Sequence, residues 1–169
     1  TTVTTPVVCS GESNGVITVN LSAGNNNPSY TYQITAGLVT RPVQPSNVFT
    51  GLPAGSYTVQ VNSGRGCSTP ATNVIVGSPT PLAATSSITT PLTCGTGNVA
   101  QPATVTVVAT PGTGTAPYQY SFDLGANYSS TNTYQSYVGT TFHVYVKDAN
   151  GCIFILTNGV SIPVLDAPT

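Results

Sequence analysis

Short runs of alternating apolar and polar residues, separated by glycine, proline and asparagine, make up most of this chain. Three of the longest are VITV at 16–19, VTVV at 105–108 and FHVYV at 142–146. β-Branched and aromatic residues favour strands, and apolar residues at every second position indicate a strand with one buried face. Good helix formers are scarce throughout. The pattern therefore predicts an all-β protein.

The same pattern occurs twice along the chain. TVTTPVVC at 2–9 matches SITTPLTC at 87–94, and SYTVQV at 56–61 matches TFHVYV at 141–146, both at an offset of 85 residues. A fixed internal period indicates tandem domains, and short strands separated by turn residues are typical of a sandwich. We predict two tandem immunoglobulin-like β-sandwich domains, residues 1–78 and 79–169. The proline-containing spacer GSPTP at 77–81 favours an elongated pair.

Alternation also predicts which face of a strand is buried. The residues expected to face the two cores are Tyr57, Val59 and Val61, and their equivalents Phe142, Val144 and Val146. Asn14-Gly15 and Asn150-Gly151 are expected to form tight turns that need a positive φ angle.

The low charge of the chain excludes some functions. Of its 169 residues, three are Lys or Arg and four are Asp or Glu, which leaves no basic cluster for nucleic acid or for an anionic membrane surface. No apolar run reaches the roughly 18 residues that a membrane-spanning helix requires. We therefore expect neither nucleic-acid binding nor membrane insertion.

Each copy contains two cysteines with the same separation. The interval from Cys9 to Cys67 equals the interval from Cys94 to Cys152, which favours disulfides Cys9–Cys67 and Cys94–Cys152 over the two other connectivities. Disulfides would indicate an oxidising, extracytoplasmic compartment. Two alternatives stay open: a zinc site, which would lack close cysteine pairs, and reduced, buried thiols.

Taken together, these elements resemble the SprB-type repeat of gliding and surface adhesins in Bacteroidota. The matching elements are an early cysteine, a Pro-Tyr-x-Tyr segment, the segment GLPAGSYTVQV at 51–61 and the closing DANGC at 148–152. The first copy departs from the pattern, since it ends in NSGRGC at 62–67, and the second lacks the Gly-Leu-x-Ala-Gly turn. The resemblance implies export to the cell surface as part of a longer protein or fibre.

Few side chains could perform catalysis. The candidate acids and bases are Glu12, Asp123, His143, Asp148 and Asp166. His143 is expected on the solvent face of its strand, and the first copy has no histidine, so no catalytic triad can recur in both copies. The sequence DANG at 148–151 could suit a calcium loop, but it lacks further carboxylates and is more typical of a turn. We predict no enzymatic activity, no metal site and no cofactor.

Two groups of residues could bind or carry sugars. Tyr30, Tyr32, Tyr118 and Tyr120 alternate on strands, where they could stack on sugar rings, although core packing with a hydroxyl bonded to the backbone is the favoured interpretation. Asn20 and Asn127 fit the short acceptor pattern for N-glycosylation.

These features predict an extracellular structural and adhesive module, forming the stalk or shaft of a cell-surface adhesin or filament. The expected partners are further copies of the repeat, joined head to tail or by strand addition. The alternative is a carbohydrate-binding module of a secreted protein, with a surface polysaccharide as partner. That alternative needs an exposed aromatic platform, often built with tryptophan, and the chain contains no tryptophan.

Overall fold

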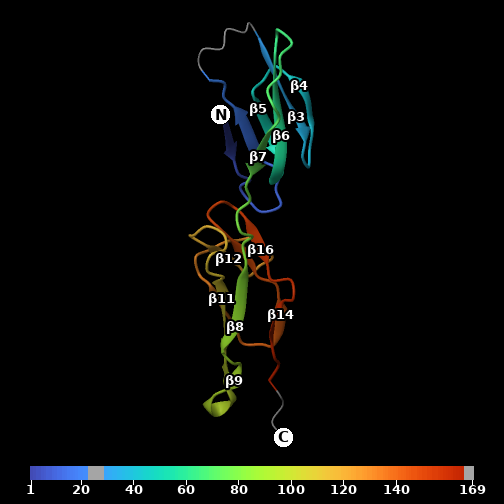
Figure 1. Ribbon diagram of the computed structural model, residues 1–169. Helices are drawn as coiled ribbons and strands as arrows, with labels where there is room; N and C mark the ends of the chain where they lie inside the picture. The colour runs from blue at the N-terminus through green and yellow to red at the C-terminus, as the bar shows by residue number, and fades with distance from the viewer. Residues whose placement is uncertain (23–28, 166–169) are drawn as a thin grey trace. The chain divides into compact units, whose positions relative to one another are not determined.

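A computed structural model describes residues 1–22 and 29–165 of the chain (Figure 1). Apart from one 3-10 turn, η1 at Thr96–Asn98, the regular elements in these ranges are all β-strands. The all-β fold predicted from the sequence is therefore confirmed. Pro28 and Asp166 lie outside the described residues.

The chain divides into two compact units, Thr1–Pro79 and Thr80–Thr169, which are called here the first and second repeat. No helix in the described ranges is long and apolar enough to cross a membrane.

The first repeat is a sandwich of two antiparallel sheets. One sheet has the strand order β1-β2-β5 and the other β4-β3-β6-β7. The strands are β1 (Thr2–Thr5), β2 (Gly15–Val19), β3 (Tyr30–Ala36), β4 (Arg41–Gln44), β5 (Val48–Leu52), β6 (Gly55–Ser63) and β7 (Thr72–Val76).

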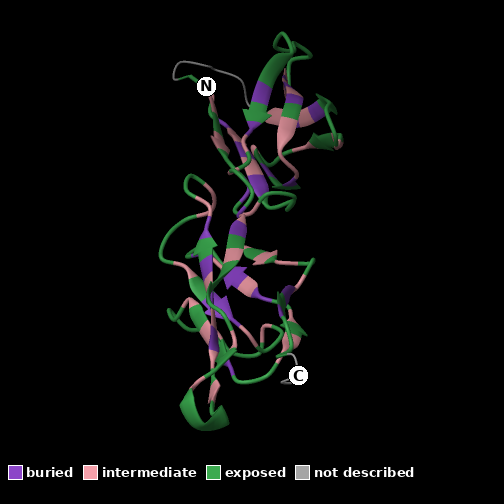
Figure 2. Ribbon diagram, turned by 90° about the horizontal axis from the view of Figure 1, so that it is seen from below, coloured by how far each residue is buried: buried purple, intermediate pink, exposed green. Residues whose placement is uncertain are grey.

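The core of the first repeat follows from the period of two in its strands. Tyr57, Val59 and Val61 on β6 are buried against Ile17 and Phe49 of the other sheet. The residues between them are of intermediate burial, and the strands in Figure 2 likewise change between buried and less buried segments along their length. The predicted inward face of this strand is confirmed.

The second repeat has a similar plan, divided into more sheets. Its larger sheets have the orders β13-β11-β8 and β12-β15-β16, with two-stranded pairs β14-β17 and β10-β9. The strands are β8 (Ala84–Thr90), β9 (Thr93–Cys94), β10 (Ala100–Gln101), β11 (Ala103–Ala109), β12 (Gln119–Ser121), β13 (Thr133–Ser136), β14 (Thr140–Phe142), β15 (Tyr145–Lys147), β16 (Ile153–Ile155) and β17 (Val160–Ile162).

The core of the second repeat has the same origin. Val105 and Val107 of β11 are fully buried against Val144 and Val146. Phe142, the equivalent of Tyr57, is only half buried. Each repeat therefore has its own core between two sheets, as an immunoglobulin-like β-sandwich requires.

The two predicted Asn-Gly turns have different outcomes. Gly151 has a φ of +86°, as predicted for a tight turn. Gly15 instead begins β2 with a φ outside the positive range, so that prediction was wrong. Glycine is needed there because a Cβ atom would lie 2.7 Å from the carbonyl oxygen of Leu52 and collide with the Val76 side chain.

In the first repeat the chain enters at one end of the sandwich and leaves at the other. At the entry end, the backbone N–H of Asn20 donates to the carbonyl of Thr1. Both β1 and β7 run from there toward the exit end, where Val7 N–H donates to the carbonyl of Gly77.

The second repeat has the same polarity. At its entry end, Ala83 N–H donates to the Thr113 hydroxyl just before β8 begins. Strands β8 and β17 both run away from this end, and the chain leaves beside Gly139, close to Val164.

Candidate functional site

The four cysteines do not pair as the sequence predicts. Cys9 and Cys152 are disulfide-bonded, whereas Cys67 and Cys94 are free, exposed thiols. The predicted disulfides Cys9–Cys67 and Cys94–Cys152 are therefore wrong.

Distance explains this result in the first repeat. Cys9 follows Val7 at the exit end, whereas the carbonyl of Cys67 accepts from Ser63 N–H at the entry end. Between the two ends runs β6, whose nine residues cover about 26 Å at about 3.3 Å per residue. A disulfide needs Cα atoms within about 7 Å of each other.

The second repeat separates its cysteines in the same way. Cys152 lies at the entry end, where Asp148 contacts the loop of Gly114 beside Leu82. Cys94 lies at the other end, beyond the last residue of β8. The seven residues of β8 alone cover about 20 Å. In both repeats, the early cysteine lies at the exit end and the late cysteine at the entry end.

The turns that carry the two late cysteines have the same backbone geometry. Ser63 N–H donates to the Cys67 carbonyl at 2.8 Å, and Asp148 N–H donates to the Cys152 carbonyl at 3.0 Å. In both turns the cysteine N–H donates back to a side-chain oxygen, Ser63 Oγ at 3.3 Å or Asp148 Oδ1 at 2.9 Å. The glycine before each cysteine has a φ of +83° or +86°. The same type of turn therefore carries a free thiol, Cys67, in the first repeat and a bonded cysteine, Cys152, in the second.

The early cysteines share their anchor, but the turn after the anchor differs between the repeats. Val7 is buried in the first core, and its equivalent Leu92 packs against the second. After the anchor, Cys9 begins a turn in which Glu12 N–H donates to its carbonyl. Cys94 instead lies in strand β9, where its backbone is opposite Ala100 of β10.

The DANG segment is a turn built around a buried carboxylate. Asp148 is only 4% exposed, and its carboxylate accepts hydrogen bonds of 2.9 Å from the backbone N–H groups of Thr115, Asn150 and Cys152. These bonds satisfy the charge without a cation. No group of three or more His, Cys, Asp or Glu side chains suited to a metal ion occurs within residues 1–22 and 29–165.

The other candidate acids and bases in the described part of the chain are Glu12, Asp123 and His143, and each lies in a separate loop. His143 is exposed between β14 and β15, and Glu12 accepts hydrogen bonds from Cys9 N–H and the Asn14 amide in the first repeat. Asp123 lies in the loop after β12, where the Ser121 hydroxyl donates to it at 2.6 Å and Asn127 donates from both its backbone and its side chain. These bonds, that from Ser121 first, lower the pKa of Asp123 to about 2.

The four candidate sugar-binding tyrosines pack against the cores. Tyr32 and Tyr120 are buried, and Tyr30 and Tyr118 are partly buried beside them. The Tyr118 hydroxyl donates to the carbonyl of Thr113 at 2.8 Å, whereas the Tyr30 hydroxyl is buried without a partner among the described residues. They therefore form no exposed platform. The sequence analysis placed Tyr57 in the core but did not predict that its hydroxyl donates to the Pro53 carbonyl at 2.7 Å.

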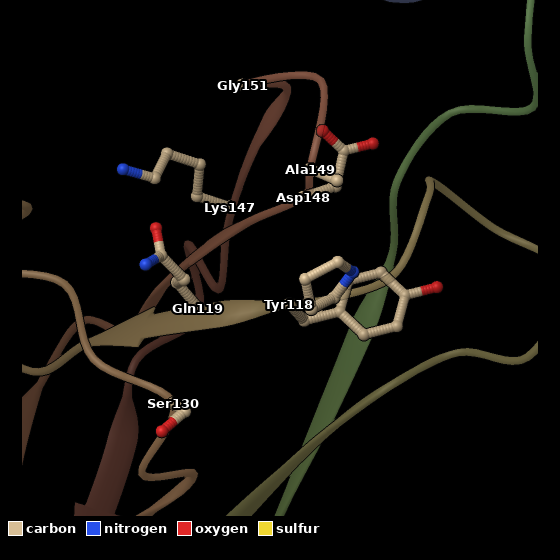
Figure 3. Close-up of a pocket in the computed structure, with 8 residues that line it drawn as sticks. Tyr118, Gln119, Ser130, Lys147, Asp148, Ala149 and Gly151 are labelled. Atoms are coloured by element: carbon tan, nitrogen blue, oxygen red, sulfur yellow. The ribbon is translucent and has the colours of Figure 1, made fainter.

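Two shallow depressions lie side by side on the second repeat. One, of about 560 Å³, is lined by Tyr118, Gln119 and Lys147 among others (Figure 3). The other, of about 400 Å³, includes Asp123 and Tyr128. The Lys147 ammonium lies 4.1 Å from the centre of the Tyr128 ring, a cation–π contact that holds the lysine against the surface.

The two possible glycosylation sites are both exposed. Asn20 directly follows β2, and the Asn127 side chain donates to Asp123 at 2.7 Å.

The chain is similar to a known family and to a solved structure. The search of curated proteins found no match. A solved structure described as "Structures of Clostridium thermocellum CbhA fibronectin(III)-like modules" is similar at 14% sequence identity and a TM-score of 0.34, over 97% of this chain and 94% of that chain. Because this score is low, the sandwich assignment rests on the sheets and cores described above. Residues 1–39 match the family model described as the SprB repeat, which confirms the predicted SprB-type resemblance over that part of the chain.

Proposed function

We propose that this chain is an extracellular structural and adhesive module that forms part of the stalk or shaft of a cell-surface adhesin or filament. One observation carries the proposal: each repeat is a separate sandwich that the chain enters at one end and leaves at the other. Repeats with this polarity can be joined in series without a reversal of the chain. The match of residues 1–39 to the SprB repeat supports the same role.

The outer strands of the first repeat suit a load-bearing module. The first strand, β1, and the last, β7, run in the same direction and contact each other. Tension applied to the two ends of this repeat would pull β1 and β7 in opposite directions along their length. The hydrogen bond from Val7 N–H to the Gly77 carbonyl, at 3.1 Å, would resist that movement.

The disulfide supports an extracytoplasmic location. Cys9 and Cys152 are oxidised, and structural disulfides persist mainly in oxidising compartments. Only 4% of the residues are charged, so hydroxyl and amide groups supply most of the polar surface.

The described residues provide no site for the competing functions. An enzyme needs an acid, base or nucleophile gathered in a pocket, whereas Asp148 is committed to a turn and His143 is exposed on its own. A carbohydrate-binding module needs an exposed aromatic platform, and the alternating tyrosines pack inward.

Surface labelling of intact cells tests the proposal. An antibody raised against the purified chain should label unpermeabilised cells that express the native protein, and brief external protease should remove the label. A cytoplasmic protein, probed in the same sample, should resist that protease. Label that appears only after permeabilisation would overturn the proposal, and binding to a glycan array that Tyr128→Ala abolishes would favour the carbohydrate-binding alternative.

A further inference from the structure

The unpaired thiols of this chain are equivalent to its bonded cysteines. Cys67 matches Cys152, and Cys94 matches Cys9, at the repeat offset of 85 residues. In each matched pair one member is disulfide-bonded and the other is free. The difference therefore lies in what each position can reach and not in its place within the repeat.

A cysteine in this fold cannot pair within its own repeat. The entry and exit ends are separated by the length of a strand, about 20 Å or more in both repeats. The bonded cysteines obey this rule, because the other cysteine of the first repeat, Cys67, is free and so is the other cysteine of the second, Cys94. A disulfide at Cys67 or Cys94 would need a cysteine of another repeat.

The polarity of the chain decides which cysteine that partner is. In a series of such repeats, the exit end of one is followed by the entry end of the next. An early cysteine lies at the exit end and a late cysteine at the entry end, so a head-to-tail joint between two copies of the chain would bring Cys94 of one copy to Cys67 of the other.

We propose that Cys94 of one copy of this repeat pair forms a disulfide with Cys67 of another copy. Both thiols are exposed, and the turn around Cys67 already has the hydrogen bonds that hold the bonded Cys152. In a filament made in this way, disulfides link successive copies of the chain. This inference deepens the proposed structural role, on which its biological meaning rests.

The bond needs an oxidant, and a small-molecule or protein disulfide serves. The Cys94 thiol loses its proton and attacks one sulfur of the oxidant, which releases one thiolate and leaves a mixed disulfide on Cys94. The Cys67 thiolate of the other copy then attacks the Cys94 sulfur and expels the second thiolate. Two thiols are oxidised to one disulfide, and the oxidant is reduced to two thiols.

Two single variants of the full 169-residue chain test the pairing. Cys67→Ser leaves only Cys94 free, and Cys94→Ser leaves only Cys67 free. Each is incubated with oxidised glutathione alone and in an equal mixture with the other, one variant being labelled with ¹⁵N. Non-reducing electrophoresis and peptide mass spectrometry identify the products.

The proposal expects a heterodimer from the mixture, in about tenfold excess or more over either homodimer, because docking of matched ends raises the effective thiol concentration. The wild type should form a ladder of oligomers that dithiothreitol removes. Homodimers in the statistical proportion of random collision would overturn the proposal, as would an absence of cross-linking or a peptide that joins Cys9 to Cys67. Circular dichroism of both variants must match that of the wild type.

This experiment is independent of the cellular one. Surface labelling without a heterodimer would reject the pairing and leave the proposed function standing. A heterodimer from a chain that is not displayed on the cell would support the pairing and reject the proposed function.

Discussion

The backbone N–H of Cys152 donates a 2.9 Å hydrogen bond to Oδ1 of Asp148, and Asp148 N–H donates in return to the Cys152 carbonyl at 3.0 Å. Because the same carboxylate also accepts from Thr115 and Asn150, Asp148→Ala leaves three N–H groups without a partner. We expect the second repeat to lose about 3 kcal/mol of unfolding free energy. Urea unfolding followed by amide NMR signals of each repeat would measure this.

The matched control for Asp148→Ala is Ser63→Ala in the first repeat. It removes one longer bond, of 3.3 Å to Cys67 N–H, and should cost about 0.5–1 kcal/mol. Equal losses in the two variants would show that the buried carboxylate has no special role in its turn.

The cysteine states can be read directly with a thiol reagent. N-ethylmaleimide, applied to the native monomer before any oxidant is added, should label Cys67 and Cys94, because they are free and exposed, and spare the bonded Cys9 and Cys152. After reduction and unfolding, all four should react. Labelling of no cysteine in the native protein, or of Cys9, would contradict the structure.

Removal of the Tyr57 hydroxyl and of the Tyr30 hydroxyl should have opposite effects on the stability of the first repeat. Tyr57→Phe removes the 2.7 Å bond to the Pro53 carbonyl and should destabilise the first repeat by about 1 kcal/mol. The Tyr30 hydroxyl is buried with no partner among the described residues, so Tyr30→Phe should leave stability unchanged or raise it by up to about 1 kcal/mol. Thermal unfolding of both variants measures these changes in stability. If Tyr30→Phe destabilised the repeat as much as Tyr57→Phe, the Tyr30 hydroxyl would have to be hydrogen-bonded.

Gly15 should tolerate substitution less well than a glycine with a positive φ. In Gly15→Ala the new methyl group meets the Leu52 carbonyl and the buried Val76, which we expect to cost about 2–3 kcal/mol. Gly66 has a φ of +83°, and a methyl group added there would have no neighbour within 4 Å, so Gly66→Ala should cost about 1 kcal/mol from backbone strain alone. Urea midpoints of the two variants test the order, and the reverse order would contradict the close contact at β2.

The Asp123 loop should respond to acid at an unusually low pH. Hydrogen bonds from Ser121 and Asn127 lower the pKa of this carboxyl from 3.8 to about 2. Since the folded pKa lies below the unfolded one, the ionised group stabilises the loop above about pH 3.8, and this contribution is lost as pH falls through about 2. Side-chain carbon NMR shifts should titrate accordingly, and Ser121→Ala should raise the pKa toward 3.8; an unchanged pKa in this variant would contradict the assigned cause.

Much of the fold could be predicted because it depends on local pattern. Alternation in β6 placed Tyr57, Val59 and Val61 in the core, and all three are buried. The Gly15 turn could not be predicted, because an Asn-Gly pair fits both a tight turn and a strand start that approaches another backbone closely. Only the position of Val76 and Leu52, which are distant in sequence, distinguishes the two.

The sequence by itself determined that the protein is all-β, that it contains two copies of one repeat, and which strand faces are buried, since these follow from periods of two and of 85 residues. The tertiary structure alone decided the state of the cysteines. Equal spacing of Cys9 to Cys67 and of Cys94 to Cys152 follows from the duplication of the repeat, whatever the pairing. A disulfide forms only between cysteines whose Cα atoms lie within about 7 Å, and the strands of each sandwich hold its own two cysteines at opposite ends.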